Sequence, residues 1–325
     1  MRFVSRLVGV AAVLALGMSA AAQDAPKRSV ALTFDDVPYT GATAEAPGQT
    51  VAIADAQFVN EAIRTMLVDQ GVPATAFVTE QNVLTLEAEG ARVVRRWVRS
   101  GLDLGNHGAR HLDSNNLTLG EIETEIVQGE ATISKLAAEF ERPIHFYRFA
   151  YNHVGDTEEK RVAIEALLAE HDYRLAAATI DTSDYLFDAA FVRAGRERKA
   201  DLRARIVEAY LTHTRAQVRY YAALNAEVLG YEPPAIMLLH ANALNAEVME
   251  DLLTLFRAEG YDFVSLDAAM ADAAYAQSPK VATRFGPMWG YRWASERGVR
   301  VDGSKEQEPP DWVGAYAKDG TVPAE

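Results

Sequence analysis

A repeated alternation of short apolar segments with longer amphipathic ones is the feature that most constrains the fold. Ser29 to Thr33 is apolar and β-branched, so it reads as a buried strand, which runs into a loop at Phe34-Asp35-Asp36. Strands that alternate with helices predict a parallel sheet with right-handed crossovers. Together the strand-like segments predict an α/β fold, a distorted (β/α) barrel of about seven strands. The six further strands are predicted over residues 74–78, 102–106, 144–148, 175–180, 235–239 and 261–265.

Helical spacing of apolar residues marks the segments between the strands. Such residues recur from Ile53 to Leu67, and Gly71-Val72-Pro73 closes that segment. A long charged stretch with the same spacing interrupts the alternation and predicts a helical insertion, a hairpin, over about residues 189–231. The remaining helices are predicted over residues 51–67, 91–98, 117–140, 158–170 and 245–258.

The pattern divides the chain into a barrel over residues 23–275 and a C-terminal extension over residues 276–325. Gly, Pro and charged residues mix in the extension with Trp289, Trp293 and Trp312, so we expect it to be irregular. We expect these aromatic residues to pack the extension on the barrel rather than to form a sugar-stacking platform.

Residues 1–22 have the three parts of a secretory signal peptide. Arg2 and Arg6 precede an apolar run from Leu7 to Leu16, and Ser19-Ala20-Ala21-Ala22 follows it. The run is shorter than the roughly 20 residues that span a bilayer, which disfavours a membrane anchor. We expect cleavage near Ala22, no stable membrane anchor, and an exported protein that is periplasmic or secreted.

The chain contains no cysteine, which excludes disulfides, a thiolate nucleophile and a cysteine-ligated zinc site. The formal charge is −14, and it becomes −16 once the two arginines of the signal peptide are removed. An acidic surface of this kind disfavours nucleic acid and anionic membranes as partners.

Residues that can carry chemistry follow the predicted strands at their carboxyl ends. In barrels and parallel sheets, catalytic groups converge on this face. The sequence therefore predicts an active site there. The residues are Asp35, Asp36, His107, His111, Arg148, Asp184 and His240.

A metal site is predicted within this set. His107 and His111 are four residues apart, a spacing that brings two imidazoles to one side of a helical turn. The side chains of Asp35 and Asp36 diverge after a strand, so one can bind an ion while the other acts as a base. Asp36 and the two histidines form a ligand set that suits Zn²⁺, with Co²⁺ or another divalent ion as alternatives. Asp35 is then left to accept a proton from water.

With these residues, the chain resembles the polysaccharide deacetylases with a NodB homology domain, carbohydrate esterase family 4. The resemblance covers five motifs between Thr33 and His240. Thr33-Phe34-Asp35-Asp36 matches the first motif, which makes Asp35 the catalytic base and Asp36 a metal ligand by resemblance. The histidine pair matches the second motif, although Gly108 replaces the Ser or Thr that often follows the first histidine.

The third motif usually reads Arg-x-Pro-aromatic-Gly. Arg148-Phe149-Ala150-Tyr151-Asn152 keeps the arginine and the aromatic residue but lacks Pro and Gly. By resemblance, Arg148 steadies the base, and the backbone N–H of Tyr151 binds the oxyanion.

The fourth motif, Asp-Trp, is present as Asp184-Tyr185, with Tyr185 in place of the tryptophan that walls the acetyl pocket. The fifth motif, Leu-x-His, is present as Leu238-Leu239-His240. By resemblance, His240 is the general acid, and Asp184 tunes its pKa and orientation. A histidine near its ordinary pKa of about 6.5 suits this task.

These roles predict a metal-dependent hydrolase of C–N bonds that removes acyl groups, N-acetyl first, from an acetylated glycan or amino sugar. A related hydrolase of non-sugar amides is one alternative, and a glycan-binding protein that has lost catalysis is another. A third is an Fe(II) oxygenase, since such enzymes use the same two-histidine, one-carboxylate ligands.

The remaining histidines are predicted to lie mostly outside the active site. We expect His171 and His213 at the surface, because both lie on charged helical segments, and His145 in a structural role beside a strand. His153 follows the altered third motif, so a loop position and a place in the site both stay open.

Overall fold

The structure is a computed structural model that describes residues 28–42 and 53–321. The predicted signal peptide, residues 1–22, lies outside this part of the chain. Within the described residues, no helix combines the length and the apolar character that a membrane span requires.

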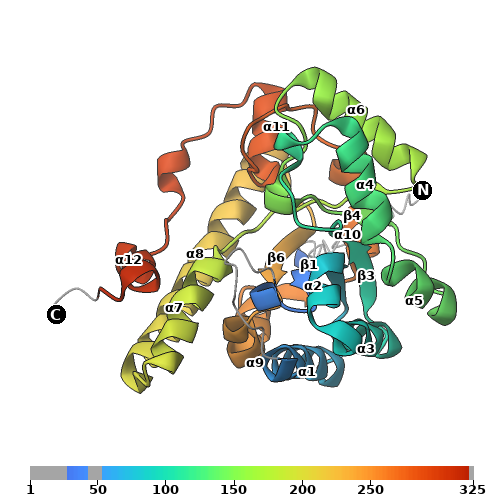
Figure 1. The fold of residues 1–325 in the computed structure, drawn as a ribbon. Coiled ribbons are helices and arrows are strands. Elements are labelled where there is room, and N and C mark those ends of the chain that lie inside the picture. The colour runs from blue at the N-terminus through green and yellow to red at the C-terminus, as the bar shows by residue number, and fades with distance from the viewer. Residues whose placement is uncertain (1–27, 43–52, 322–325) are drawn as a thin grey trace, which may run out of the picture.

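Parallel strands form one sheet at the centre of the molecule, and helices lie around it (Figure 1). The strands are β1 (Arg28–Val37), β2 (Ala74–Val78), β3 (Asp103–Asn106), β4 (Phe146–Tyr147), β5 (Arg174–Leu175), β6 (Ala235–His240) and β7 (Tyr261–Phe263). Six of them run in the order β5-β4-β3-β2-β1-β6, and β7 pairs with β1. Beyond β5 the chain reaches Ile180, which bridges Met237 of β6, so the two edges of the sheet approach each other. The prediction of a distorted (β/α) barrel is confirmed.

Strand β1 is buried along most of its length and pairs with three other strands. Its residues from Val30 to Phe34 are at most 1% exposed, and burying each large apolar side chain contributes about 1.5–3 kcal/mol. The strand continues through Asp35 and Asp36 to Val37, so the prediction that these aspartates lie in a loop is wrong. Pairing with β2 shifts register between Phe34 and Val37, which bends the strand at the two aspartates.

The helices that surround the sheet follow the predicted alternation with shifted ends. They are α1 (Ile53–Asp69), α2 (Glu80–Thr85), α3 (Glu87–Arg99), α4 (Leu119–Gly129), α5 (Ile133–Phe140), α6 (Glu158–Glu170), α9 (Ala243–Ala258) and α10 (Leu266–Met270). The single helix predicted over residues 117–140 is in fact α4 and α5. The carboxylate of Glu80 accepts hydrogen bonds from the backbone N–H and the hydroxyl of Thr132, and this contact stabilises a new helix start there.

The strand predicted over residues 175–180 is shorter than expected, because β5 ends at Leu175. The carbonyl oxygen of Ala177 accepts a hydrogen bond from Nη2 of Arg148 at 2.8 Å, not from a neighbouring strand. A buried arginine thus takes the place of a strand partner at Ala177, whereas Thr179 and Ile180 form backbone hydrogen bonds with β6.

The charged insertion is a helical hairpin, in which α7 (Asp184–Arg196) packs against α8 (Ala200–Leu229). The C-terminal extension is less irregular than predicted, since it contains α11 (Trp289–Arg297) and α12 (Asp311–Asp319). These two helices pack on α8 and α7, so the extension runs along the hairpin (Figure 1).

Aromatic residues attach the extension to the rest of the molecule. Trp289 and Trp293 are buried and pack with Tyr275 at ring distances of 5.8 and 5.5 Å. Arg205 of α8 lies 4.6 Å over the ring of Trp312. The prediction that these tryptophans pack the extension on the barrel is confirmed.

The surface position predicted for His213 is wrong, because this residue is 2% exposed. It lies on α8 with its ring 5.5 Å from that of Phe187, and neither ring nitrogen has a hydrogen-bond partner among the described residues. Burial lowers the pKa of His213 to about 4, which keeps the ring neutral at pH 7. Helical spacing showed that α8 is amphipathic, but not that the extension covers it.

We expect His213 to make the protein sensitive to acid. Its pKa is about 4 in the folded state and about 6.5 in the unfolded chain, so the unfolded state binds more protons between these values. The free energy of unfolding should therefore fall as the pH drops from 6.5 to 4, by on the order of 3 kcal/mol from this group. Urea titrations across this range should show a shallower pH dependence in His213→Leu than in wild type. His145→Gln is the control, because it removes a histidine whose side chain is exposed and not one that is buried.

Candidate active site

The sheet register brings predicted site residues from separate strands to the same edge. Asp35 of β1 is paired in register with His240 of β6. His107 and Arg148 each follow paired residues of β3 and β4, and Nδ1 of His107 lies 2.8 Å from the carbonyl oxygen of Arg148. These four side chains come from the carboxyl ends of four strands, where parallel sheets gather functional groups.

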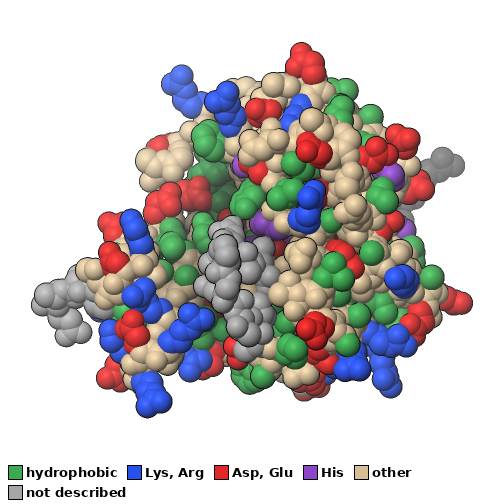
Figure 2. Space-filling view, viewed as in Figure 1, with side chains coloured by type: hydrophobic (Ala, Val, Ile, Leu, Met, Phe, Trp, Pro, Cys, Tyr) green, Lys and Arg blue, Asp and Glu red, His purple; other side chains and the backbone are tan. Residues whose placement is uncertain are grey.

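A cavity of about 500 Å³ opens at this edge, a size that is ordinary for ligand sites. Histidine side chains, purple in Figure 2, are visible near the middle of the face shown there. Arg148 and Asp184 are buried beside the cavity and hold residues that line it. The predicted site residues in its lining are Asp35, Asp36, His107, His111, Tyr151, Tyr185 and His240.

Asp36, His107 and His111 form a possible metal site, since one ligand atom from each lies within 4.8 Å of the others. Oδ1 of Asp36 is 3.7 Å from Nε2 of His107 and 3.6 Å from Nε2 of His111. Ligands of a tetrahedral zinc ion are separated by roughly 3.4 Å, so these atoms fit one ion after a small movement. Nδ1 of His107 lies against the carbonyl oxygen of Arg148, which can only accept, so the ring proton is on Nδ1. Nε2 therefore presents its lone pair to an ion.

The two histidines do not lie on a helical turn, as their spacing suggested, but in the loop after β3. His111 has a φ of 58°, and Asp36 has a φ of 60°, both in the left-handed region that non-glycine residues rarely occupy. Gly108 has a φ of 87°, and a Cβ there would lie 2.8 Å from the hydroxyl of Tyr147. Glycine at position 108 is thus required by the local backbone and by the close packing of this loop.

Asp35 is held by a buried arginine. Nη1 of Arg148 donates to Oδ1 of Asp35 and to Oγ1 of Thr33, each at 2.7 Å. Burial by itself raises the pKa of Asp35, but Arg148, and after it His107, hold that pKa below its ordinary value. Asp35 is therefore ionised at neutral pH, and its Oδ2 lies 3.9 Å from Nε2 of His107, beside the metal site.

His240 forms a tight pair with Asp184, the first residue of α7. Nδ1 of His240 lies 2.6 Å from Oδ1 of Asp184, and the backbone N–H of His240 donates to Oδ2. Burial lowers the pKa of His240, but the Asp184 carboxylate outweighs this and raises it to about 10. Asp184 therefore tunes the pKa of His240 as the resemblance implies, but to well above the ordinary value of about 6.5, because the buried carboxylate stabilises the imidazolium.

Two tyrosines flank the cavity. Tyr151 is 50% exposed, and its ring centroid lies 4.9 Å from that of His111. Its φ of 58° and the φ of 54° at Asn152 show that this turn keeps a left-handed backbone although the sequence lacks the usual glycine. Tyr185 is 59% exposed, and its ring centroid lies 6.3 Å from that of His240.

The N-terminal part of the chain matches the model of a known protein family. Residues 22–169 match the family model described as polysaccharide deacetylase. The sequence of this segment is therefore similar to that of the polysaccharide deacetylase family. The resemblance inferred from the motifs is confirmed, and Asp35, Asp36, His107, His111 and Arg148 all lie within the matched residues.

Solved structures of a carbohydrate esterase family 4 pseudoenzyme and of two deacetylases each match about three quarters of this chain. A mutant of BA3943, described as a family pseudoenzyme, superposes with a TM-score of 0.50 at 16% identity, over 75% of this chain and 68% of that chain. The polysaccharide deacetylase Bc1974 from Bacillus cereus gives 0.49 at 18% identity, over 74% and 92% of the two chains. The peptidoglycan deacetylase PdaC from Bacillus subtilis gives 0.47 at 17% identity, over 76% and 91%.

Three residues of the site were missed from the sequence. Asn242 and Asn245 donate hydrogen bonds to Oδ2 of Asp184, and Asn245 also donates to the carbonyl oxygen of His240. Asp181 lines the cavity directly after the Ile180 bridge. The sequence feature that could have indicated Asp181 was its position directly after a predicted strand, where the other predicted site residues also lie. Burial raises the pKa of Asp181, and the backbone N–H of Ser183 opposes that effect.

The other histidines lie outside the cavity lining. His153 is not among the lining residues, and its Nδ1 lies 2.7 Å from Oδ1 of Asp113. His145 lies directly before β4 with an exposed side chain, and its carbonyl oxygen accepts a hydrogen bond from the backbone N–H of Arg174, so it lies beside a strand as predicted. His171 is partly exposed and lies 3.5 Å from Glu123, close to the surface position expected for it.

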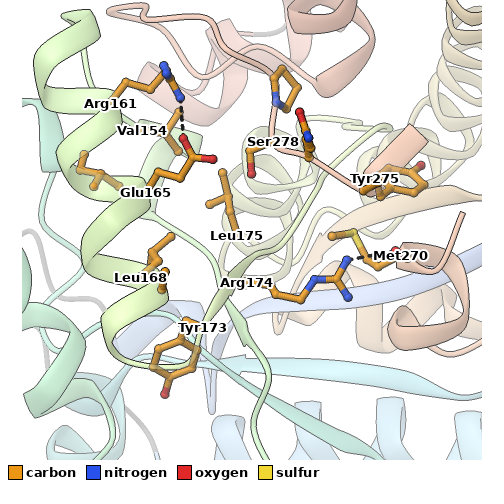
Figure 3. A pocket seen from close by; sticks show the side chains of 15 residues that line it. Val154, Arg161, Glu165, Leu168, Tyr173, Arg174, Leu175, Met270, Tyr275 and Ser278 are labelled. Atoms are coloured by element: carbon orange, nitrogen blue, oxygen red, sulfur yellow. Dashed lines mark hydrogen bonds and ion pairs between the residues drawn. The ribbon is translucent and has the colours of Figure 1, made fainter. Parts of the chain in front are cut away.

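A second cavity, of about 220 Å³, lies between α6 and residues 270–279 (Figure 3). Its two arginines already have partners, because Arg161 pairs with Glu165, and Arg174 donates to the carbonyl oxygen of Met270. The two cavities share no lining residue among the described residues. The second cavity therefore contains none of the predicted site residues.

Proposed function

We propose that this protein is a metal-dependent hydrolase that removes acyl groups, N-acetyl first, from an amino sugar of a carbohydrate. One observation carries the proposal: a possible metal site, an ionised aspartate and a protonated histidine face the same cavity. A sugar-binding protein has no need of this combination.

Asp36, His107 and His111 would hold the ion, and their nitrogen and oxygen donors suit Zn²⁺. Such an ion supplies Lewis-acid polarisation of the acyl carbonyl and of the attacking water. The chain itself supplies the movement of protons and the orientation of the reacting groups.

Asp35 accepts the proton of the attacking water in this proposal. Arg148 keeps its carboxylate ionised and fixes its direction through Oδ1, which leaves Oδ2 toward the reacting groups. The backbone N–H of Tyr151 stabilises the negative charge that develops on the acyl oxygen.

His240 donates a proton to the leaving nitrogen as the C–N bond breaks. Asp184 keeps the imidazole protonated and oriented through Nδ1, so Nε2 carries the proton to be donated. An amide leaving group needs this acid more than an ester does, and this supports N-deacylation.

Acetate release by the purified mature protein tests the proposal. The substrates are a chitooligosaccharide, peptidoglycan and acetylated xylan, each with zinc and with a chelator. We expect acetate from an N-acetylated substrate and its loss with the chelator. Sugar binding without acetate release would favour the binding protein, and oxygen consumption with Fe(II) would favour the oxygenase.

We also propose that the protein acts outside the cytoplasm, since residues 1–22 have the pattern of a signal peptide. N-terminal sequencing of protein from the periplasmic and culture fractions should find a mature chain that begins after Ala22.

A further inference from the structure

The C-terminal extension contacts the turn formed by Phe149 to His153, which carries the proposed oxyanion donor. Nη2 of Arg292 donates to the carbonyl oxygen of Asn152 at 2.7 Å. The backbone N–H of Thr283 donates to the carbonyl oxygen of Gly155 at 3.0 Å, just beyond the turn. The extension also supplies Gly286 to the lining of the active-site cavity.

Arg292 is buried, which is unusual for an arginine. Its side chain is 3% exposed, and Nε donates to the carbonyl oxygen of Pro287. No carboxylate pairs with it among the described residues, and burial lowers its pKa to about 10. A buried cation without a counter-charge costs stability, so packing alone does not explain an arginine at this position. Its contact with Asn152 gives it a specific partner.

The turn requires outside support. Tyr151 and Asn152 both have a left-handed backbone, with φ values of 58° and 54°, which is unfavourable for residues other than glycine. The sequence lacks the proline and glycine that usually shape this motif. Such a backbone persists where surrounding contacts hold it, and Arg292 makes one of them.

Gly286 supplies a second contact on the same turn. A Cβ at this position would lie 1.7 Å from the carbonyl oxygen of Tyr151, closer than any side chain can approach. The extension therefore packs directly on the backbone of Tyr151, and glycine at position 286 permits this approach.

We propose that Arg292 is a positioning residue, which holds the Phe149–His153 turn so that the Tyr151 N–H faces the developing oxyanion. The extension thereby becomes part of the active site, although it lies outside the residues that match the family. This inference rests on the proposed function for its catalytic consequence, while its structural claim concerns the turn alone.

Steady-state acetate release by the zinc-loaded full chain provides the kinetic test, with Arg292→Met, Arg292→Lys and Gly286→Ala. We expect kcat to fall by about 10- to 100-fold in Arg292→Met and in Gly286→Ala, with KM changed less than about 3-fold. Removal of one oxyanion donor costs about 100- to 1,000-fold, and a misplaced donor should cost somewhat less. Arg292→Lys keeps the charge and should recover part of the rate.

Arg297→Met is the matched control, because Arg297 lies on the same helix, is exposed and donates to Val228 instead of the turn. It should keep the wild-type kcat. A fall in kcat that is equal in Arg297→Met and Arg292→Met, or a rise in KM alone, would overturn the proposal.

Hydrogen–deuterium exchange of residues 149–153 separates this inference from the proposed function. We expect faster exchange there in Arg292→Met than in Arg297→Met, whether or not the wild type hydrolyses the test substrates. If exchange is faster in Arg292→Met while the wild type hydrolyses none of the test substrates, the positioning role is supported and the proposed hydrolase is rejected. Unchanged exchange would overturn the positioning role even if the protein is an active deacetylase.

Discussion

Asp35→Asn will lower kcat for acetate release by at least about 100-fold, the scale that general-base catalysis contributes. The amide keeps the shape of the carboxylate and can still accept a hydrogen bond from Arg148, but it cannot take a proton from water. Because Asp36 and the histidines are unchanged, the variant should bind zinc with the wild-type stoichiometry. The measurement is acetate release at saturating substrate, with the metal content determined on the same samples.

Asp251→Asn is the control for this change, since it makes the same substitution on the exposed side of α9. It should retain the wild-type rate. A rate for Asp35→Asn above about a tenth of wild type, with full metal content, would show that another group removes the proton.

His107→Gln is expected to remove both metal binding and activity. Loss of an outer partner of a ligand costs about 10- to 100-fold in metal affinity, and loss of a direct ligand should cost at least about 100-fold. Zinc at 1,000 times its dissociation constant should stabilise the wild-type fold by about 4 kcal/mol. Thermal unfolding with and without zinc should show a rise in Tm for wild type and little change for the variant.

His145→Gln serves as the matched histidine control, because His145 is exposed and does not line the cavity. It should bind zinc and release acetate as the wild type does. An unaltered zinc response in His107→Gln would mean that Asp36 and His111 bind the ion without this imidazole, and the ligand set would need revision.

Much of the site could be predicted because its residues follow a positional rule. Asp35, His107, Arg148 and His240 each lie near the carboxyl end of a strand or just beyond it, and parallel strands bring these ends together. Asp181 obeys the same rule, but it matches no motif residue and was missed. Asn242 and Asn245 were missed because they act through Asp184, and nothing in the local sequence indicates that partner.

The electrostatic state of the site was not predictable from the sequence. The pKa of His240 depends on a carboxylate 56 residues away in the chain, at 2.6 Å in space and shielded from water. His213 has the local sequence of a surface helix, yet it is buried in the folded protein. In both cases, burial and partners come from segments distant in sequence.

The sequence by itself determined the order of strands and helices, the residue types of the possible metal site and the similarity of residues 22–169 to the polysaccharide deacetylases, because these depend on local periodicity and on short motifs. Only the tertiary structure decided which groups are ionised, where the two aspartates lie, and that the extension contacts the Tyr151 turn. The physical reason is that desolvation, register and long-range hydrogen bonds exist only after distant segments have packed together.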